Sequence, residues 1–166
     1  KVKRYLDKDR YDHTIGVMHT AGCLAMRYGA DLEKALIAGL LHDCAKCVPS
    51  AEKIKLCERN HIEISEAEYQ NPGLLHAKLG AFFARKKYGI EDEEILRSIE
   101  SHTTGRPKMS LLDKIIYIAD YMEPGRDVAP NLPEVRALAF VDLDACLYRI
   151  LEDTLAYLEK KGATVD

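Results

Sequence analysis

The 166-residue sequence lacks the features of membrane-spanning, secreted and nucleic-acid-binding proteins. No apolar run is long enough to cross a bilayer, and the charged N-terminal stretch has no apolar segment typical of a signal peptide. The five cysteines are an odd set without framework spacing, so we expect reduced thiols in a cytosolic (cytoplasmic) protein. A net charge of −3 with interspersed signs predicts no nucleic-acid partner and no anionic membrane partner.

Strand-like alternation, internal repeats and low-complexity linkers are missing too, whereas helical periodicity recurs along almost the whole chain. Hydrophobic residues make up 47% and charged residues 31%, which is typical of a soluble globular protein. We therefore expect one all-α domain over residues 1–166. Caps and stop residues predict helices over residues 12–28 (or from slightly earlier), 32–46, 50–59, 71–88, 91–102, 111–122 and 143–161, with short helices after Ser65 and Asn131.

Several of these helices place imidazole or acidic side chains where an apolar face is expected. His42 and Asp43 lie in "ALIAGLLHDCA", Asp120 falls on the apolar face of "DKIIYIADYM", and His76 lies in "NPGLLHAKLGAFF". A metal ion with imidazole co-ligands would compensate the buried carboxylates, and with His13 the ligands would come from several helices of a bundle. The alternative is an ordinary hydrogen-bonded acceptor, since chance alone predicts about half a His-Asp pair in such a chain.

Five short blocks identify a more specific likeness. The order His…His-Asp…Asp resembles the HD superfamily of metal-dependent phosphohydrolases, which are all-helical. The blocks "RYDHTIGVMHTA", "AGLLHDCAK", "NPGLLHAKLGA", "SHTTG" and "KIIYIADYMEPGR", spread over residues 10–126, are similar to the YqeK family of symmetrical dinucleoside tetraphosphatases. The resemblance implies an HD-domain helical bundle with its metal site in the core. It also implies hydrolysis of diadenosine tetraphosphate to two ADP.

Carried over residue by residue, the resemblance makes His13, His42, Asp43 and Asp120 the metal ligands and His42, Asp43 and Lys46 the catalytic group. Two imidazoles and two carboxylates suit iron, manganese, zinc or another divalent metal, and the resemblance favours iron. It also implies a nucleotide partner, with ADP or GDP as product-like ligands, and a homodimer.

The resemblance places further histidines against the phosphates of the substrate. His76 and His102, with the adjoining Thr103, are expected to bind them. The alternative is a second metal ion held by the two histidines and bridged by Asp43. From the sequence pattern alone, His76 could instead be a core histidine that bonds a backbone carbonyl, and His102 could be the C-cap of a helix.

Three other residues are candidates for substrate binding. Lys46 could bind a phosphate or stabilise the leaving group, although an isolated lysine at a helix end is commonly just solvated. Arg126 could clamp a phosphate with its planar fork, or pair with a neighbouring aspartate in its loop. Gly16 would allow a ligand to approach the backbone, and close helix packing explains it equally well. Cys44 and Cys47 form a single CxxC and are expected to be bystanders.

Two other classes of function remain open on the sequence. One is another HD phosphohydrolase, such as a nucleoside monophosphatase or a guanosine alarmone hydrolase. The other is a non-catalytic sensor that binds metal and nucleotide. The family usually continues into a polar tail that approaches the nucleotide base, whereas this sequence ends at "KKGATVD", so we expect an incomplete base-binding part.

Overall fold

The computed structural model describes residues 2–4 and 6–162, and these residues form helices and connecting turns without a β-strand. The all-α prediction is therefore confirmed for the described part of the chain. Its elements are the short 3-10 helix η1 (Val2–Arg4) and the α-helices α1 (Lys8–Tyr28), α2 (Leu32–Leu41), α3 (Ser50–Arg59), α4 (Glu66–Gln70), α5 (His76–Tyr88), α6 (Glu93–Ser101), α7 (Leu111–Met122), α8 (Leu132–Leu138) and α9 (Leu143–Lys161). Residues 163–166, where the family's base contacts were expected, lie outside the described residues.

Most helix ends fall where the capping residues predict them. Aspartate side chains accept backbone N–H groups in the first turns of α1, α2, α6 and α9. Ser65 and Ser110 each form a capping box with the acidic residue three positions later. Gly29 and Gly89 end α1 and α5 in the left-handed conformation, which glycine adopts without steric cost.

The helix predicted over residues 32–46 is shorter in the structure. Helix α2 ends at Leu41, and residues 42–47 form consecutive turns. The N–H of Cys44 donates to Leu41 O (3.0 Å) and that of Lys46 to Asp43 O (2.9 Å), so the spacing is i→i+3. Neighbouring residues on an α-helix do not face each other. The turns instead bring the side chains of His42 and Asp43 to one point, with His42 Nε2 3.6 Å from Asp43 Oδ2.

Two smaller differences concern helix starts. Residues 71–75 form turns ahead of α5, so that His76 is the first residue of that helix rather than lying inside it. Ser50 is the first residue of α3 and does not cap it with its side chain. In α3 the N-cap position is occupied by Pro49, which has no side-chain acceptor, so Ser50 falls one position too late to cap the helix.

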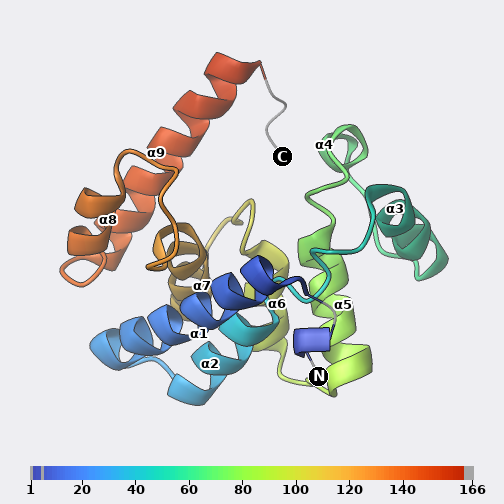
Figure 1. Cartoon of the computed structure of the whole chain (residues 1–166), viewed down its shortest axis with the longest axis horizontal. Coiled ribbons are helices and arrows are strands. Elements are labelled where there is room, and N and C mark those ends of the chain that lie inside the picture. The colour runs from blue at the N-terminus through green and yellow to red at the C-terminus, as the bar shows by residue number, and fades with distance from the viewer. Residues whose placement is uncertain (1, 5, 163–166) are drawn as a thin grey trace.

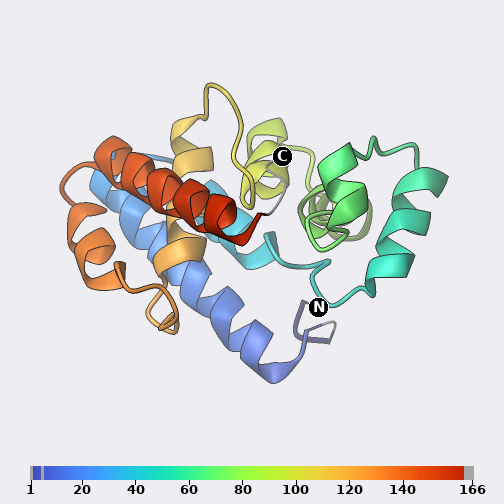
Figure 2. The same ribbon diagram turned by 90° about the horizontal axis from the view of Figure 1, so that it is seen from above.

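Helix α7 lies at the centre of the molecule. It contacts α1, α2, α6, α8 and α9, and most of its residues are buried. Figure 1 shows α8 and α9 on one side of this group and α3 and α4 on the other, beyond α5. In Figure 2, which views the molecule from above, α9 (red) lies in front of the other helices of this group. This arrangement brings His13, the turn after α2 and the end of α7 together.

The hydrophobic core has two parts. The larger cluster joins α1, α2, α6, α7, α8 and α9, and includes Leu24, Ile116 and Ile150. The smaller cluster packs Cys57 against α5 and the turn after α2. None of the described helices is long and apolar enough to cross a membrane.

Candidate metal centre

Four side chains predicted as ligands converge between α1, α2 and α7. His13 comes from α1, His42 and Asp43 from the turn after α2, and Asp120 from the last turns of α7. His13 Nε2 lies 3.0 Å from Asp120 Oδ1 and 3.9 Å from Asp43 Oδ2. His42 Nε2 lies 3.6 Å from Asp43 Oδ2 and 3.8 Å from Asp120 Oδ1. We call these four residues the primary cluster. Ligand atoms of His13, His42 and Asp43 lie within 4.8 Å of one another, and so do those of His42, Asp120 and the neighbouring His102.

The hydrogen bonding of the primary cluster fits a metal ion. Among the buried side-chain atoms of the described residues, His13 Nε2, His42 Nε2 and Asp43 Oδ1 have no hydrogen-bond partner. Buried polar atoms normally have one, because leaving them unpaired costs free energy. Two imidazole nitrogens and a carboxylate oxygen are also ligand atoms that a borderline divalent metal accepts. A cation in the primary cluster would satisfy the two imidazole nitrogens, whereas Asp43 Oδ1 points to the other side, towards His76 and His102.

The two histidines of the primary cluster each turn Nδ1 towards an acceptor oxygen. His42 Nδ1 donates to Gly39 O at 2.7 Å, and His13 Nδ1 donates to Glu123 Oε1 at 3.0 Å. Because Nδ1 of each ring faces an acceptor oxygen, Nε2 is the ring nitrogen that remains to bind a metal ion. Burial also lowers the pKa of His42 to about 4, so this imidazole is neutral at pH 7.

A second group of side chains meets the other oxygen of Asp43. His76 Nε2 lies 3.2 Å and His102 Nε2 3.7 Å from Asp43 Oδ1, and the two nitrogens are 3.1 Å apart. Thr103 Oγ1 lies 3.2 Å from both nitrogens, and Lys46 Nζ is 3.1 Å from His76 Nε2. The structure therefore brings four of the predicted phosphate-binding side chains together beside Asp43. The same geometry is open to a second ion bridged by Asp43.

The charges around the two carboxylates favour their ionised form. Burial alone would raise the pKa of Asp43, but the neighbouring His102 and His76 hold that pKa well below its usual range. Burial opposes ionisation of Asp120 in the same way, and contact with His13 together with the charge of Arg126 keeps its pKa low. Both carboxylates are thus anionic at neutral pH and available as ligands.

Arg126 contacts the cluster directly. Its guanidinium donates from Nη2 to Asp120 Oδ1 at 2.7 Å and from Nε to Asp120 O at 3.0 Å. The arginine therefore pairs with the ligand carboxylate rather than with the next residue in its loop. At Gly16 a Cβ would overlap the carboxylate of Glu123, which agrees with close packing, one of the two explanations predicted for this glycine. This close packing explains the glycine, and its contact with substrate stays a prediction.

The cysteines beside the site are free thiols. Cys44 is buried, and burial raises its pKa to about 12, so it is protonated and unreactive at neutral pH. Its thiol approaches Gly80 O at 3.5 Å. Cys47 is exposed. Nothing in this arrangement pairs the two sulfurs, and the bystander role predicted for them stays a prediction.

Three residues near the site were missed by sequence reasoning. Arg10 donates from Nη1 to Asp43 Oδ2 at 3.0 Å, and Glu123 accepts the proton of His13 Nδ1. Each lies three residues from a predicted ligand, Arg10 before His13 and Glu123 after Asp120, but the residue it contacts is far along the chain, so the sequence contains no signal for either contact. Lys53 on α3 is only 4% exposed, and its pKa is lowered by burial and then by the charge of Lys46. Nothing in the sequence distinguishes Lys53 from an ordinary helix lysine.

Comparison with known proteins places these observations in a family. The HD domain matches residues 10–125, a range that contains the whole primary cluster. The symmetrical bis(5'-nucleosyl)-tetraphosphatase of Bacillus subtilis (strain 168) is 44% identical over 164 residues, which covers 99% of this chain and 87% of that protein. The protein of the same name from Staphylococcus aureus (strain NCTC 8325 / PS 47) is 36% identical over 165 residues, or 98% of this chain and 84% of that protein.

A solved structure agrees with the fold. The crystal structure of a predicted HD superfamily hydrolase involved in NAD metabolism, from Clostridium acetobutylicum, is similar to this chain with a TM-score of 0.94. The two chains are 45% identical, and the match covers 98% of this chain and 86% of the other. The likeness therefore extends over the peripheral helices as well as the core.

Proposed function

The chain belongs to the HD-domain family, and on that premise we propose that it is a metal-dependent hydrolase of dinucleoside tetraphosphates. Its substrate is diadenosine tetraphosphate or a related molecule, and its products are two nucleoside diphosphates. The main support from the structure is the meeting of His13, His42, Asp43 and Asp120 with unpaired ligand atoms between them. The support for the substrate is the name of the relatives at 36–44% identity.

The primary cluster would hold the metal ion, which on binding supplies Lewis acidity and lowers the pKa of water. We propose iron as the resident ion, with manganese, zinc or another divalent metal as the ions that the ligand set also accepts. Glu123 orients the ring of His13, and the Gly39 carbonyl orients that of His42. Metal analysis of the purified protein by mass spectrometry tests the identity of the ion, and a preparation that retains only zinc would contradict iron.

The second group of side chains would bind the phosphates. Lys46 lies beside Asp43 and Arg126 beside Asp120, and His76, His102 and Thr103 offer further hydrogen-bonding atoms next to Asp43. Such groups neutralise the oxygens as negative charge moves towards the leaving nucleotide. Lys46 Nζ, 3.7 Å from Asp43 Oδ1, is the cation we assign to the leaving group.

Symmetrical cleavage follows from where the attacked phosphorus lies. Attack by water at the second phosphorus from one nucleoside breaks the bond to the third phosphate and leaves a nucleoside diphosphate on each side. One water is consumed, its oxygen stays on the attacked phosphorus, and the other diphosphate leaves with the bridging oxygen. The binding groups must therefore hold the middle of the tetraphosphate at the primary cluster.

Product analysis tests this proposal. The iron-loaded protein is incubated with diadenosine tetraphosphate, and the nucleotides are separated by anion-exchange chromatography. Two ADP per substrate is the expected result. ATP with AMP would contradict symmetrical cleavage, and intact substrate across several metals would favour a nucleotide sensor. A panel with nucleoside monophosphates and guanosine alarmones separates the other HD phosphohydrolase activities.

A further inference from the structure

Lys53 lies on the buried face of α3, where an apolar residue is expected. The other charged residues of this helix are exposed, whereas Lys53 is only 4% exposed and shares the buried face with Cys57, four positions later. Cys57 belongs to the smaller hydrophobic cluster, together with Ala45 and Leu75. Each of these two residues directly precedes a predicted phosphate-binding residue. The side chain of Lys53 is therefore directed into the protein, towards the site.

Lys53 is also the exception among the buried charged side chains of the described residues, because it makes no hydrogen bond or ion pair. The others have a partner in the chain: Asp43 with Arg10, Glu68 with Lys78, Asp113 with Arg106, and Glu123 with His13. The ammonium group still reaches an opening, since Nζ is not among the fully enclosed atoms that lack a partner. A largely buried ammonium without an acceptor costs free energy, which indicates that a ligand supplies the acceptor.

The charges around Lys53 add to this cost. Burial lowers its pKa, the charge of Lys46 lowers it further, and Asp43 opposes both with a smaller effect. Asp43 is already engaged, because its carboxylate lies 3.0 Å from Arg10 Nη1 and 3.7 Å from Lys46 Nζ. Lys46 and Lys53 thus form a pair of like charges at one edge of the site, and an anion with several charges would neutralise both.

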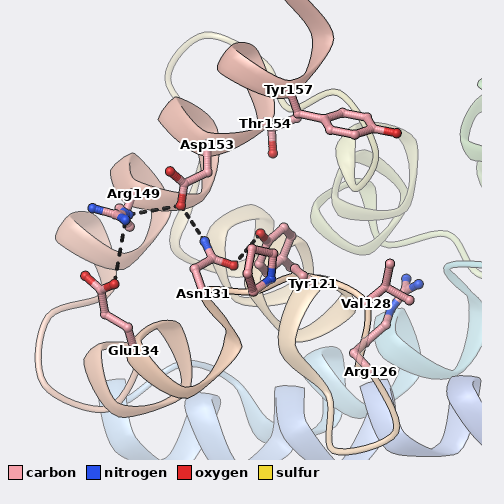
Figure 3. Close-up of a pocket in the computed structure, with 11 residues that line it drawn as sticks. Tyr121, Arg126, Val128, Asn131, Glu134, Arg149, Asp153, Thr154 and Tyr157 are labelled. Atoms are coloured by element: carbon pink, nitrogen blue, oxygen red, sulfur yellow. Dashed lines mark hydrogen bonds and ion pairs between the residues drawn. The ribbon is translucent and has the colours of Figure 1, made fainter. Parts of the chain in front are cut away.

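The cations on the α9 side of the site are paired within the chain instead. An outer cavity of about 710 Å³ lies there, between α9 and the loop that follows α7, and Arg126 and Arg149 line it. Arg126 Nη2 donates to Asp120 Oδ1 at 2.7 Å. Figure 3 shows Arg149 paired with Asp153. Lys53 does not line this cavity, so a phosphate that it binds lies on the α3 side of the primary cluster.

From these observations we infer that Lys53 binds the departing diphosphate of the substrate beside Lys46, an inference that rests on the proposed function. Lys46 meets the phosphate next to the broken bond, and Lys53 meets the phosphate beyond it. Lys53 then favours a substrate with four phosphates over one with three, because the same cleavage of a triphosphate releases only a nucleoside monophosphate on this side. Lys53 acts in binding and holds no metal.

Binding of inorganic triphosphate tests this inference. Lys53→Met removes the charge and keeps an unbranched side chain, and Lys55→Met makes the same change at an exposed position of the same helix. By calorimetry on the metal-loaded protein, we expect the Kd for triphosphate to rise about tenfold in Lys53→Met and to stay unchanged in Lys55→Met. Lys53→Arg should retain part of the affinity. Orthophosphate, which has no second phosphate for Lys53, should bind all of these proteins equally.

Kinetics and stability separate a binding role from a structural one. For Lys53→Met, kcat/KM for diadenosine tetraphosphate should fall about tenfold, and kcat/KM for diadenosine triphosphate should change by less than about twofold. The unfolding temperature of the ligand-free Lys53→Met protein should equal or exceed that of the wild type, because the substitution removes a buried ammonium without a partner.

Four results would overturn the inference: equal triphosphate affinity in wild type and Lys53→Met, an equal loss of orthophosphate binding, a wild type that does not bind triphosphate, or a lower unfolding temperature for Lys53→Met. If the wild type binds triphosphate but releases no ADP from diadenosine tetraphosphate, the proposed function fails while the triphosphate comparison still decides on Lys53.

Discussion

At the scale of single residues, the side chains that meet in the primary cluster could be predicted, but the groups that contact them from outside could not. Asp43 and Asp120 stand out because a carboxylate in an apolar helix face needs compensation. Glu123 and Arg10 do not stand out, because each lies in a polar stretch where a charged residue is expected. Their roles depend on the tertiary contacts to His13 and Asp43, which no local pattern contains.

Removal of Glu123 should weaken metal binding without unfolding the protein. Glu123→Ala leaves the His13 ring without its Nδ1 partner, and loss of such a partner commonly costs 10- to 100-fold in metal affinity. Glu123→Gln keeps an acceptor oxygen and should lose less. Isothermal titration calorimetry with the metal ion measures the affinity of each variant. Glu100→Ala, at an exposed site on α6, is the control, and equal affinity in all four proteins would contradict an orienting role.

Gly16→Ala should have the same effect through the same carboxylate. The added Cβ would overlap Glu123 and push it away from His13, whereas in Gly22→Ala, on the same helix, the Cβ meets the movable end of Leu36 at 3.0 Å. We expect lower metal affinity for Gly16→Ala and unchanged affinity for Gly22→Ala. In the double variant with Glu123→Ala the second change should add little, since both act on one contact. Additive losses would show that Gly16 acts elsewhere, for example on substrate.

At the scale of helices, the caps were predictable because they are local. Each capping residue bonds a backbone N–H only two or three positions away, so the sequence contains both partners. The end of α2 was not predictable in this way. Residues 42–47 have a sequence that favours helix, and the turns there are accompanied by contacts of His42 and Asp43 with side chains far along the chain.

The capping box of α7 should contribute measurably to stability. Ser110→Ala removes the acceptor for the Asp113 N–H at the start of the helix that contacts most of the others. We expect the free energy of unfolding to fall by about 0.5–2 kcal/mol, while Ser110→Asp retains a cap and most of the stability. Urea unfolding followed by circular dichroism measures the change, and an unaltered midpoint for Ser110→Ala would contradict it.

At the scale of the whole molecule, the all-α fold and the meeting place of the site follow from the sequence, but the outer cavity does not. The order of motifs indicates which residues converge, since each lies on a helix with an apolar face or directly after one. The cavity beside Arg126 depends on the angle at which α9 crosses the loop after α7, which no sequence pattern specifies. The homodimer, the cytosolic location and the single domain over residues 1–166 stay predictions.

Metal should stabilise the whole chain in one cooperative transition. A ligand at a hundredfold excess over its Kd adds about 2.7 kcal/mol to stability. For a chain of 166 residues this corresponds to a rise in Tm of roughly 5–10 °C over the chelator-treated protein. Differential scanning calorimetry should show a single transition in both states, and His42→Ala should show no rise. Two separate transitions would contradict the single domain.

The most direct test of the account is ADP release from diadenosine tetraphosphate by the Asp43→Ala protein, with its metal content measured on the same sample. Asp43 faces both groups of side chains, so its removal should abolish metal retention and reduce ADP release to background. Asp127→Ala, at an exposed position in the loop beside Arg126, should match the wild type in both measurements. An Asp43→Ala protein that keeps its metal and its turnover would contradict the assignment of the site.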